Sequence, residues 1–246
     1  MLKPYALMSK NNQEIVITPI GTMRTPYGQK FAVPRQPGLA PHALGVIEFF
    51  KPYGVKEAFG GLEGFSHIHI LFVFDKAPYA NFHATVRPPR LGGNTSCGVF
   101  ASRSPFRPSS IGLSTVKLVE ILEHEGEVSL VVEGADLVDG TPIIDIKPYI
   151  PFVDAIPNAL GGFASKMPPQ YPVHFSDEAK LKLADLGERR LLAITETLAQ
   201  DPRPAYKDDN DDKVYYALIY NRDVMFRVKN SVIEVIDVIV RGEPSC

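Results

Sequence analysis

Short runs of β-forming residues, divided by prolines and glycines, occupy residues 14–146 and constrain the fold more than any other feature. No helical pattern of useful length intervenes between them. The seven runs are residues 14–20, 45–50, 67–74, 98–101, 114–124, 128–133 and 143–146. Seven short strands with turn-rich connections favour a closed β-barrel or a β-sandwich.

The run at residues 67–74, HIHILFVF, is largely apolar on both of its faces. A strand that faced water on one side would alternate between apolar and polar residues. We therefore expect this strand to be buried on both sides.

The pattern changes after Pro148, where a proline-rich extended segment precedes a helical period. Ser176 is a typical N-cap, the acidic Asp177 and Glu178 follow it, and Asp201-Pro202 predicts the end of the helix. Its apolar stripe consists of Leu183, Leu186, Leu191, Ile194 and Leu198. Three strands follow, at residues 214–220, 224–229 and 231–240. We therefore expect a mainly β chain, with a barrel at residues 1–155 and a C-terminal α+β domain at residues 156–246.

Positive charge is concentrated in one loop-rich region between residues 76 and 119. This region contains no Asp or Glu, although the whole chain carries a net charge of −2. Its six basic residues are Lys76, Arg87, Arg90, Arg103, Arg107 and Lys117. Arginine presents a planar set of donors to phosphate and carboxylate groups, so the region suits an anionic partner. The alternative is a surface loop whose arginines are only solvated.

Composition excludes several classes of protein. A pI near 6.3 argues against a non-specific polyanion binder. Neither an apolar signal-peptide run nor a segment of ~20 apolar residues is present, so we expect a cytoplasmic location and no membrane. Cys97 and Cys246 are the only cysteines, which implies neither a disulfide framework nor a thiolate zinc site.

Known motifs for metals and nucleotides are also missing. His67 and His69 form an H-x-H pair, but no H-E-x-x-H or C-x-x-C supplies further ligands, so we expect no metal. No G-x-G-x-x-G follows a strand, and there is no Walker A motif, so a Rossmann nucleotide site is not expected.

Six segments together resemble one known family. They are PRQPGL at 34–39, GLEGFSHIHILFVF at 61–74, VRPPRLGGN at 86–94, SRSPFRP at 102–108, DLVDGTPIIDIKPY at 136–149 and DPRPAY at 201–206. In this order they resemble the TsaA-like β-barrel proteins, which are S-adenosylmethionine-dependent tRNA N6-adenosine methyltransferases. The resemblance covers nearly the whole chain. It implies a barrel that binds the cofactor without a Rossmann fold, a homodimer, and methylation of N6 of threonylcarbamoyladenosine beside the anticodon of threonine tRNAs.

The resemblance also assigns roles to individual residues. The residues that it places at the cofactor are Gln36, Pro37, Gly38, Asp75, Lys76, Arg103, Leu113, Gly134, Ala135, Asp136 and Leu137. Candidates for contacts with tRNA phosphates or the threonyl carboxylate are Arg87, Arg90 and Arg107. Arg203 is expected to reach the anticodon loop from the C-terminal domain, which is expected to contact tRNA. Two departures stand out: Asp75 replaces a usual histidine, and the SSIG at 109–112 replaces a usual Asn-Pro-Ile-Gly.

The target nitrogen belongs to a ureido group and should need a base to remove its proton. Asp139, Asp145 and Tyr206 lie in the right motifs and are the candidate catalytic residues. Two other functions remain open at this point. One is a non-catalytic RNA-binding barrel that uses the same basic loops. The other is a metal-dependent small-molecule enzyme built on His67 and His69.

Overall fold

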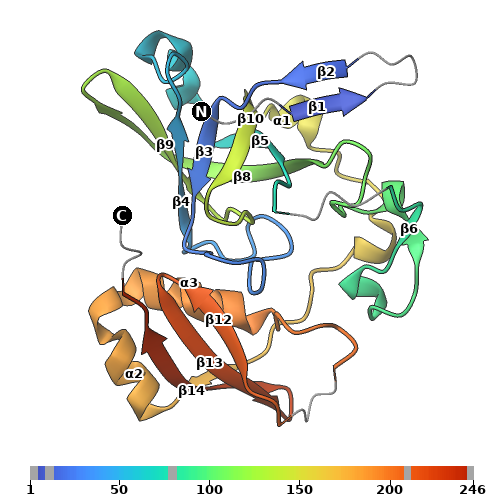
Figure 1. Ribbon diagram of the computed structural model, residues 1–246, viewed down its shortest axis with the longest axis vertical. Helices are drawn as coiled ribbons and strands as arrows, with labels where there is room; N and C mark the ends of the chain where they lie inside the picture. Colours follow the sequence, from blue (N-terminus) through green and yellow to red (C-terminus); the bar gives the residue numbers. More distant parts are fainter. Residues whose placement is uncertain (1–4, 9–13, 77–81, 208–211, 243–246) are drawn as a thin grey trace.

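The first domain is a closed six-stranded barrel in the computed structural model, which describes residues 5–8, 14–76, 82–207 and 212–242. The strand order is β10-β3-β4-β9-β8-β5, with every neighbouring pair antiparallel (Figure 1). The barrel strands are β3 (Gly21–Arg24), β4 (Leu44–Phe49), β5 (His67–Val73), β8 (Ile111–His124), β9 (Glu127–Glu133) and β10 (Thr141–Pro148). The mainly β architecture and the closed barrel are confirmed.

Alternation along these strands fills the barrel with apolar side chains. Ile68 and Ile70 of β5 are fully buried and pack with Ile47, Leu130 and Ile143 from three other strands. The remaining face of β5 is only partly covered, since His67 and His69 are neither buried nor fully exposed. Strand β5 is therefore buried on one face and half-covered on the other.

The barrel has six strands rather than about seven. Only residues 14–17 of the predicted 14–20 strand are a strand, β2 (Glu14–Ile17), which pairs with β1 (Tyr5–Met8) outside the barrel. The next strand, β3, was not predicted, and it belongs to the barrel between β10 and β4. The run at 98–101 is only a two-residue strand, β7 (Cys97–Gly98), followed by the 3-10 helix η4 (Val99–Ala101). Strand β7 pairs with β6 (Thr85–Val86) in the basic loop region, on the right of Figure 1.

The C-terminal domain is a four-stranded mixed sheet with helices packed against it. The order is β11-β14-β13-β12, formed by β11 (Val173–Phe175), β14 (Val232–Val240), β13 (Arg222–Lys229) and β12 (Tyr215–Ile219). Strand β11 was not foreseen; it is only three residues long and runs parallel to β14.

The single predicted helix is two helices, α2 (Asp177–Leu183) and α3 (Glu188–Ala199), separated by a 3-10 turn. The break lies at Gly187, whose φ of 75° is a left-handed value that no helix contains. The N-cap prediction is confirmed, because the Ala179 amide donates to Ser176 Oγ at 3.1 Å. Among the described residues, no helix is long and apolar enough to cross a membrane.

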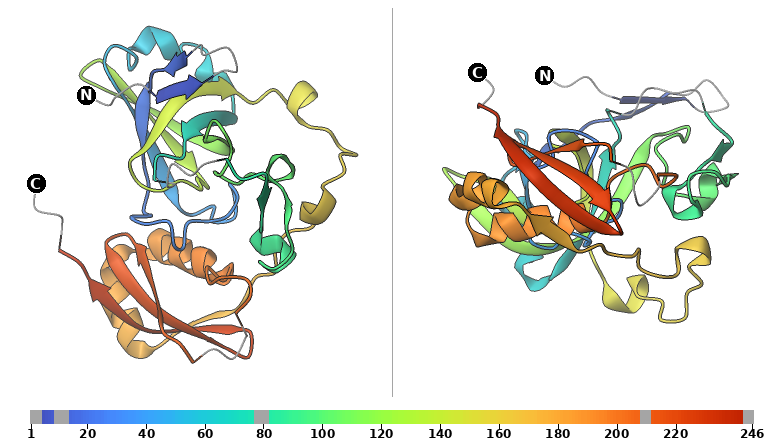
Figure 2. Two further views of the ribbon diagram at one scale, coloured as in Figure 1. Left: turned by 45° about the vertical axis from the view of Figure 1, so that its right-hand side comes forward. Right: turned by 90° about the horizontal axis from the view of Figure 1, so that it is seen from below.

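An extended connector joins the two domains and carries little regular structure. It contains α1 (Pro151–Asp154) and the 3-10 helix η5 (Gly162–Ala164), and it follows the side of the molecule that holds the basic loops (Figure 2). The other 3-10 helices are η1 (Lys56–Phe59), η2 (Leu62–Gly64), η3 (Pro89–Leu91) and η6 (Ala184–Leu186). The boundary that the sequence pattern predicts at residue 155 falls inside this connector and stays a prediction. Cys97 is a free thiol, and Cys246 lies outside the described residues.

The loop between β3 and β4 belongs to the core of the C-terminal domain. Tyr27, Ala32, Ala40 and Ala43 are buried among residues of α2, α3 and the C-terminal sheet. Tyr27 also forms a bridge to Ile219 of β12. This loop carries the PRQPGL motif, so the C-terminal domain fixes its position against the barrel.

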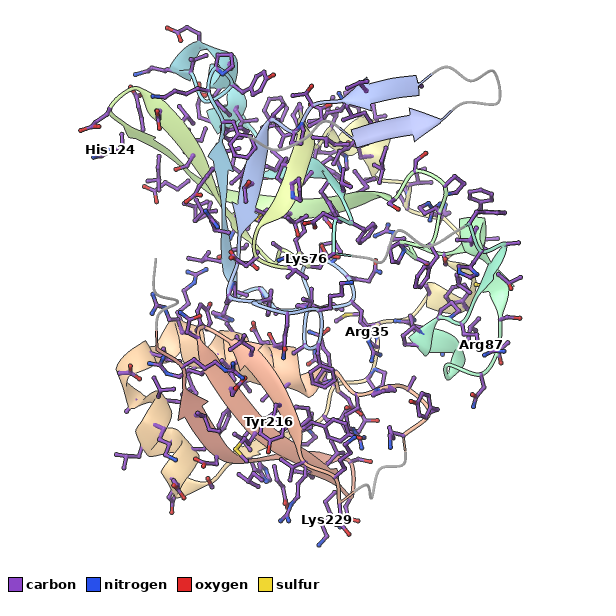
Figure 3. All side chains as sticks on the ribbon, in the orientation of Figure 1. Arg35, Lys76, Arg87, His124, Tyr216 and Lys229 are labelled. Atoms are coloured by element: carbon purple, nitrogen blue, oxygen red, sulfur yellow. The ribbon has the colours of Figure 1, made fainter. Side chains whose placement is uncertain are left out.

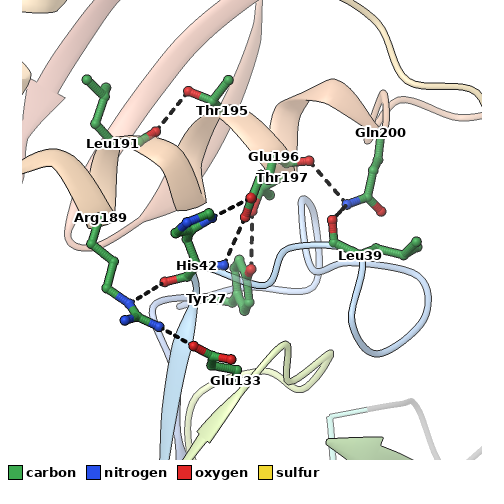
Figure 4. Close-up of polar contacts among 10 residues, drawn as sticks. All are labelled: Tyr27, Leu39, His42, Glu133, Arg189, Leu191, Thr195, Glu196, Thr197 and Gln200. Atoms are coloured by element: carbon green, nitrogen blue, oxygen red, sulfur yellow. Dashed lines mark hydrogen bonds and ion pairs between the residues drawn. The ribbon is translucent and has the colours of Figure 1, made fainter. Parts of the chain in front are cut away.

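Polar contacts to α3 reinforce the same interface (Figure 4). The Glu196 carboxylate accepts the His42 amide at 3.0 Å and contacts His42 Nδ1 at 2.5 Å. Gln200 Nε2 donates to the Leu39 carbonyl at 2.9 Å, and Arg189 Nη2 donates to Glu133 Oε1 at 2.6 Å. Loop 25–43 is therefore held along the length of the helix.

Candidate cofactor and tRNA site

A cavity of about 290 Å³ opens at the edge of the barrel that faces the C-terminal domain. Four separate segments contribute to it: the β3–β4 loop, the end of β5, the loop before β8 and the β9–β10 turn. Its lining residues are Lys30, Val33, Phe72, Phe74, Asp75, Lys76, Pro105, Phe106, Asp136, Leu137, Val138 and Thr141. The walls are mainly apolar and aromatic with two carboxylates, which is the usual make-up of a small-molecule site. Figure 3 labels Lys76 at this edge and Arg35 between the two domains.

Asp136 is the most perturbed carboxyl group of the cavity. Burial raises its pKa to about 6, although the Ser114 hydroxyl donates a hydrogen bond to Oδ1 and Arg103 opposes the rise. A carboxylate at neutral pH is therefore held there at an energetic cost. A cationic ligand group would remove that cost.

Asp75 lies at the end of β5 and is the second carboxylate of the cavity. Desolvation raises its pKa, while Lys76 and Lys30 act in the opposite direction. The Lys76 ammonium itself donates to the Asp139 carbonyl, which ties the end of β5 to the β9–β10 turn. The acidic residue at this position therefore lines the cavity rather than pointing into solvent.

Gln36 and Arg103 are 67 residues apart in sequence and contact each other, although neither side chain lines the cavity. Arg103 Nη1 donates to Gln36 Oε1 at 2.8 Å, and Arg103 is exposed. The positive charge of Arg103 acts to lower the pKa of Asp136, and its guanidinium keeps further donors accessible to an anion.

Glycine allows the PRQPGL loop to approach the β9–β10 turn closely. The Gly38 amide donates to the Gly134 carbonyl at 2.8 Å, and Gly134 has a φ of 73°. A Cβ atom on Gly134 would lie 2.8 Å from Gly38 Cα. Pro37 and Ala135 belong to the same two segments, so the predicted cofactor residues of both loops are brought together.

We expect Gly134→Ala to lower the free energy of unfolding by about 2–4 kcal/mol, because the new methyl group meets backbone that has to move. Gly126→Ala is a matched control. Gly126 also has a positive φ, 79°, but an added Cβ meets nothing within 4 Å, so only the conformational cost of about 1–2 kcal/mol applies. Urea denaturation measures both variants. Equal losses would contradict the close approach of the two loops.

Leu113 and Asp145 lie on the outside of the barrel, on opposite sides of β5, and neither lines the cavity. Leu71 of β5 pairs with Leu113 of β8 on one side and with Asp145 of β10 on the other. Leu113 is 51% exposed, and the Asp145 carboxylate is 2.8 Å from Lys147 Nζ. A β-bulge between Ile143 and Asp145 shifts the register of β10 here. The structure therefore separates Asp145 from the other predicted catalytic residues.

Asp139 and Tyr206 also lie outside the lining of the cavity. Asp139 Oδ1 accepts the Thr25 amide at 3.0 Å and so closes the turn beside the cavity. Tyr206 is 64% exposed, and its ring faces Gly93 of the VRPPRLGGN loop. Two basic-loop motifs that are distant in sequence, VRPPRLGGN and DPRPAY, thus lie in contact.

The four predicted tRNA arginines differ in their surroundings. Arg87 is exposed, as labelled in Figure 3, and Arg90 is exposed while donating to the Lys166 carbonyl. Arg107 is half-buried and donates to the Ser102 carbonyl at 2.8 Å.

Arg203 was expected to reach the anticodon loop, but its side chain is only 1% exposed and it forms two 2.8 Å hydrogen bonds with Asp201. That internal pair arises because Asp201-Pro202 turns the chain back, and it makes Arg203 a structural residue.

The two histidines of the metal alternative have different partners. His67 Nδ1 contacts Ser66 Oγ at 2.9 Å, whereas His69 lies between Thr115 Oγ1 at 2.9 Å and Asp154 Oδ2 at 3.1 Å. In the part of the chain that the structure describes, no group of three or more His, Cys, Asp or Glu residues could hold a metal ion.

Several cavity residues were missed from the sequence. Phe72 and Phe74 form an edge-to-face pair at 4.9 Å, and Ser114 orients Asp136. The period-2 pattern of the 67–74 run already placed both phenylalanines on one face. Nothing in the pattern of Lys30 or Phe106 indicates a cavity, because both lie in loops.

Comparison with known proteins gives the family. Residues 22–155 match the tRNA-methyltransferase O N-terminal domain, and residues 168–241 match the TrmO C-terminal domain. The chain belongs to the TrmO family.

Individual TrmO relatives agree with this over nearly the full length. The tRNA (adenine(37)-N6)-methyltransferase of Escherichia coli (strain K12) is 47% identical over 221 residues, 88% of this chain and 94% of that protein. A putative S-adenosylmethionine-dependent methyltransferase, RcsF, of Pseudomonas aeruginosa is 42% identical, over 90% and 96%. The crystal structure of TrmO from Pseudomonas aeruginosa superposes with a TM-score of 0.73 at 36% identity, covering 91% of this chain and 97% of that one.

Proposed function

We infer that the chain is an S-adenosylmethionine-dependent tRNA (adenine37-N6)-methyltransferase, and we propose that its substrate is N6 of threonylcarbamoyladenosine in threonine tRNAs. Membership of the TrmO family supports the activity. The observation that carries the assignment of the site is the cavity with Asp136 and Asp75 in its wall, together with Arg103, whose charge acts on Asp136. Because its substrate is tRNA, we propose that the enzyme acts in the cytoplasm.

The residues of the cavity suit the chemical groups of S-adenosylmethionine. This cofactor supplies an electrophilic methyl group on a positively charged sulfur. Asp136 and Asp75 are the carboxylates that stabilise positive charge there, and Arg103 binds a carboxylate. Phe72, Leu137 and other apolar lining residues provide surfaces for an adenine ring and exclude water. Because methyl transfer is an in-line displacement, positioning and charge account for most of the catalysis.

The proton on N6 needs an acceptor, and the cavity offers two carboxylates with raised pKa values. A raised pKa makes Asp75 and Asp136 stronger proton acceptors than ordinary surface carboxylates. Asp139 is engaged with Thr25, and Asp145 lies on the outer surface with Lys147. We therefore place the general base among the two cavity carboxylates, with Tyr206 orienting the RNA from the exposed loop.

Calorimetric titration with S-adenosylmethionine tests the site. We expect micromolar binding at one site per chain without added metal. A non-catalytic RNA-binding barrel would bind tRNA but not this cofactor, and a metal-dependent small-molecule enzyme would need a metal ion. Either result would contradict the proposal.

The basic region at residues 76–119 is larger than a site for one small cofactor requires. This supports additional contacts between its arginines and tRNA phosphates. We expect Arg87→Ala to weaken tRNA binding and to reduce the magnitude of the log–log salt slope by roughly 0.7–0.9, the loss of one phosphate contact. Lys51→Ala is the control, since the Lys51 ammonium already pairs with Glu127 at 2.8 Å. Fluorescence anisotropy at several salt concentrations measures both. An unaltered slope for Arg87→Ala would place the RNA elsewhere.

The connector supports the proposal of a homodimer. It exposes large apolar side chains that a monomer would leave in water, namely Phe152 at 89%, Ile156 at 69%, Leu160 at 100% and Met167 at 71%. We expect Phe152→Ser combined with Leu160→Ser to convert a dimer into a monomer in sedimentation equilibrium. A wild-type monomer, or a double variant that stays dimeric, would contradict this interface.

A further inference from the structure

We propose that Phe82 and Phe100, with Arg107 beneath Phe100, form a stacking surface for a nucleobase that flanks the target adenine. This inference rests on the proposed function and adds a second contact site, separate from the cofactor cavity. Its three residues come from the two ends of the basic loop region, on either side of the β6–β7 pair.

The two phenylalanines are unusually exposed for aromatic residues. Phe100 is 71% exposed and Phe82 is 53% exposed. Their ring centroids are 6.2 Å apart with an interplanar angle of 29°, so they lie roughly parallel. An apolar pair left in water inside a charged region marks an interaction surface rather than a core.

Arg107 packs against Phe100 and places a positive charge beside the two rings. Its Cζ atom lies 5.7 Å from the Phe100 ring centroid, and its Nη1 donates to the Ser102 carbonyl at 2.8 Å. Neighbouring sequence adds no negative charge, because residues 76–119 contain no Asp or Glu. Aromatic rings beside a guanidinium in a basic loop are the groups on which single-stranded bases stack. A protein partner with an apolar surface would not account for the uncompensated positive charge.

The Phe82–Phe100 pair is linked to the cavity through neighbouring residues that contact each other. His83 follows Phe82, and Phe106 precedes Arg107; the rings of His83 and Phe106 meet edge to face at 5.7 Å. Phe106 in turn lines the cavity. The stacking surface is therefore attached to the wall of the proposed cofactor cavity, next to which the target adenine has to react.

A base next to a reacting base needs such a surface. An enzyme that modifies a base draws it out of its stack, which leaves the neighbouring bases with an exposed face. Stacking on Phe100 or Phe82 replaces the lost neighbour without reading sequence, because every base has a π-face.

The test measures tRNA affinity by fluorescence anisotropy for Phe100→Ala, Phe100→Leu and Phe100→Tyr. We expect about 5- to 100-fold weaker binding for the alanine variant, a large part of that loss for leucine, and near wild-type affinity for tyrosine. The salt slope should stay unchanged, because no phosphate contact is removed. Phe82→Ala is a second, independent variant and should also weaken binding.

Three outcomes would overturn the proposal. Unchanged tRNA affinity in both alanine variants would exclude the surface from RNA binding. Full affinity in the leucine variant would show that apolar contact, not stacking, is required. A lower molar mass of the alanine variants in sedimentation would assign the pair to a second copy of the chain. Retained S-adenosylmethionine affinity confirms folding, and failure of the wild type to bind the cofactor would instead contradict the proposed function.

Discussion

Asp136→Asn should strongly weaken S-adenosylmethionine binding and at the same time stabilise the protein. The side chain lines the cavity, and burial raises its pKa to about 6. Loss of a charge-assisted contact to a cationic ligand weakens binding by more than about tenfold. Removing a desolvated charge raises the free energy of unfolding by about 1–3 kcal/mol at pH 7.5, since one pKa unit corresponds to about 1.4 kcal/mol.

The pH dependence of cofactor binding and of stability follows from the direction in which the Asp136 pKa is shifted. The pKa is raised in the folded state, so the ionised carboxylate destabilises the fold above pH 6, and this penalty disappears as the pH falls towards the unfolded value near 4. The stability gain of Asp136→Asn should therefore be full at pH 7.5 and smaller at pH 5. Cofactor affinity of the wild type should fall as the pH drops below 6, because a protonated Asp136 no longer attracts a cation.

Urea denaturation and calorimetry at the two pH values measure these effects. Asp145→Asn is the matched control, because its carboxylate lies on the outer surface beside Lys147. It should leave cofactor affinity unchanged and produce no comparable pH-dependent gain in stability. A destabilised Asp136→Asn variant that still bound the cofactor would remove Asp136 from the site.

Unmodified threonine tRNA should be a poor methyl acceptor, by at least about two orders of magnitude. The cofactor offers only one carboxylate, whereas Arg87, Arg90 and Arg103 all present exposed guanidinium groups. The threonyl carboxylate of threonylcarbamoyladenosine is a second anion for them. A site built around a paired charge discriminates strongly against a substrate that lacks the partner.

Methyl incorporation into two tRNA preparations tests this requirement. One comes from cells that cannot make the threonylcarbamoyl modification, and the other comes from normal cells. Equal incorporation into both would show that these arginines contact phosphates alone.

The barrel could be predicted from sequence because its strands are specified locally. The 67–74 run, for example, is short, largely apolar and bounded by turn residues, and β5 spans nearly the same residues. Strand β3 was missed because four residues, GTMR, give too short a pattern to recognise. In the sequence, Gly187 lies between apolar residues at helical spacing and gives no sign of a helix end. Only its positive φ in the structure shows that the helix breaks there into α2 and α3.

The site was only partly predictable, for a different reason. Gly134 and Asp136 were predicted from the family resemblance, and the structure places Gly134 against the PRQPGL loop and Asp136 in the cavity. Asp145 belongs to the 136–149 motif that begins with Asp136, but a β-bulge directs it to the outer surface. Arg203 was chosen for its charge, and no pattern indicates that it folds back onto Asp201. Local periodicity cannot encode such long-range or irregular contacts.

The most direct measurement of the central claim is nucleoside mass spectrometry of threonine tRNA incubated with the enzyme and isotopically labelled S-adenosylmethionine. The account predicts one labelled methyl group per tRNA, on threonylcarbamoyladenosine at position 37, with its N6 as the methylated atom. Label on any other nucleoside, or no label in a protein that binds both cofactor and tRNA, would contradict it.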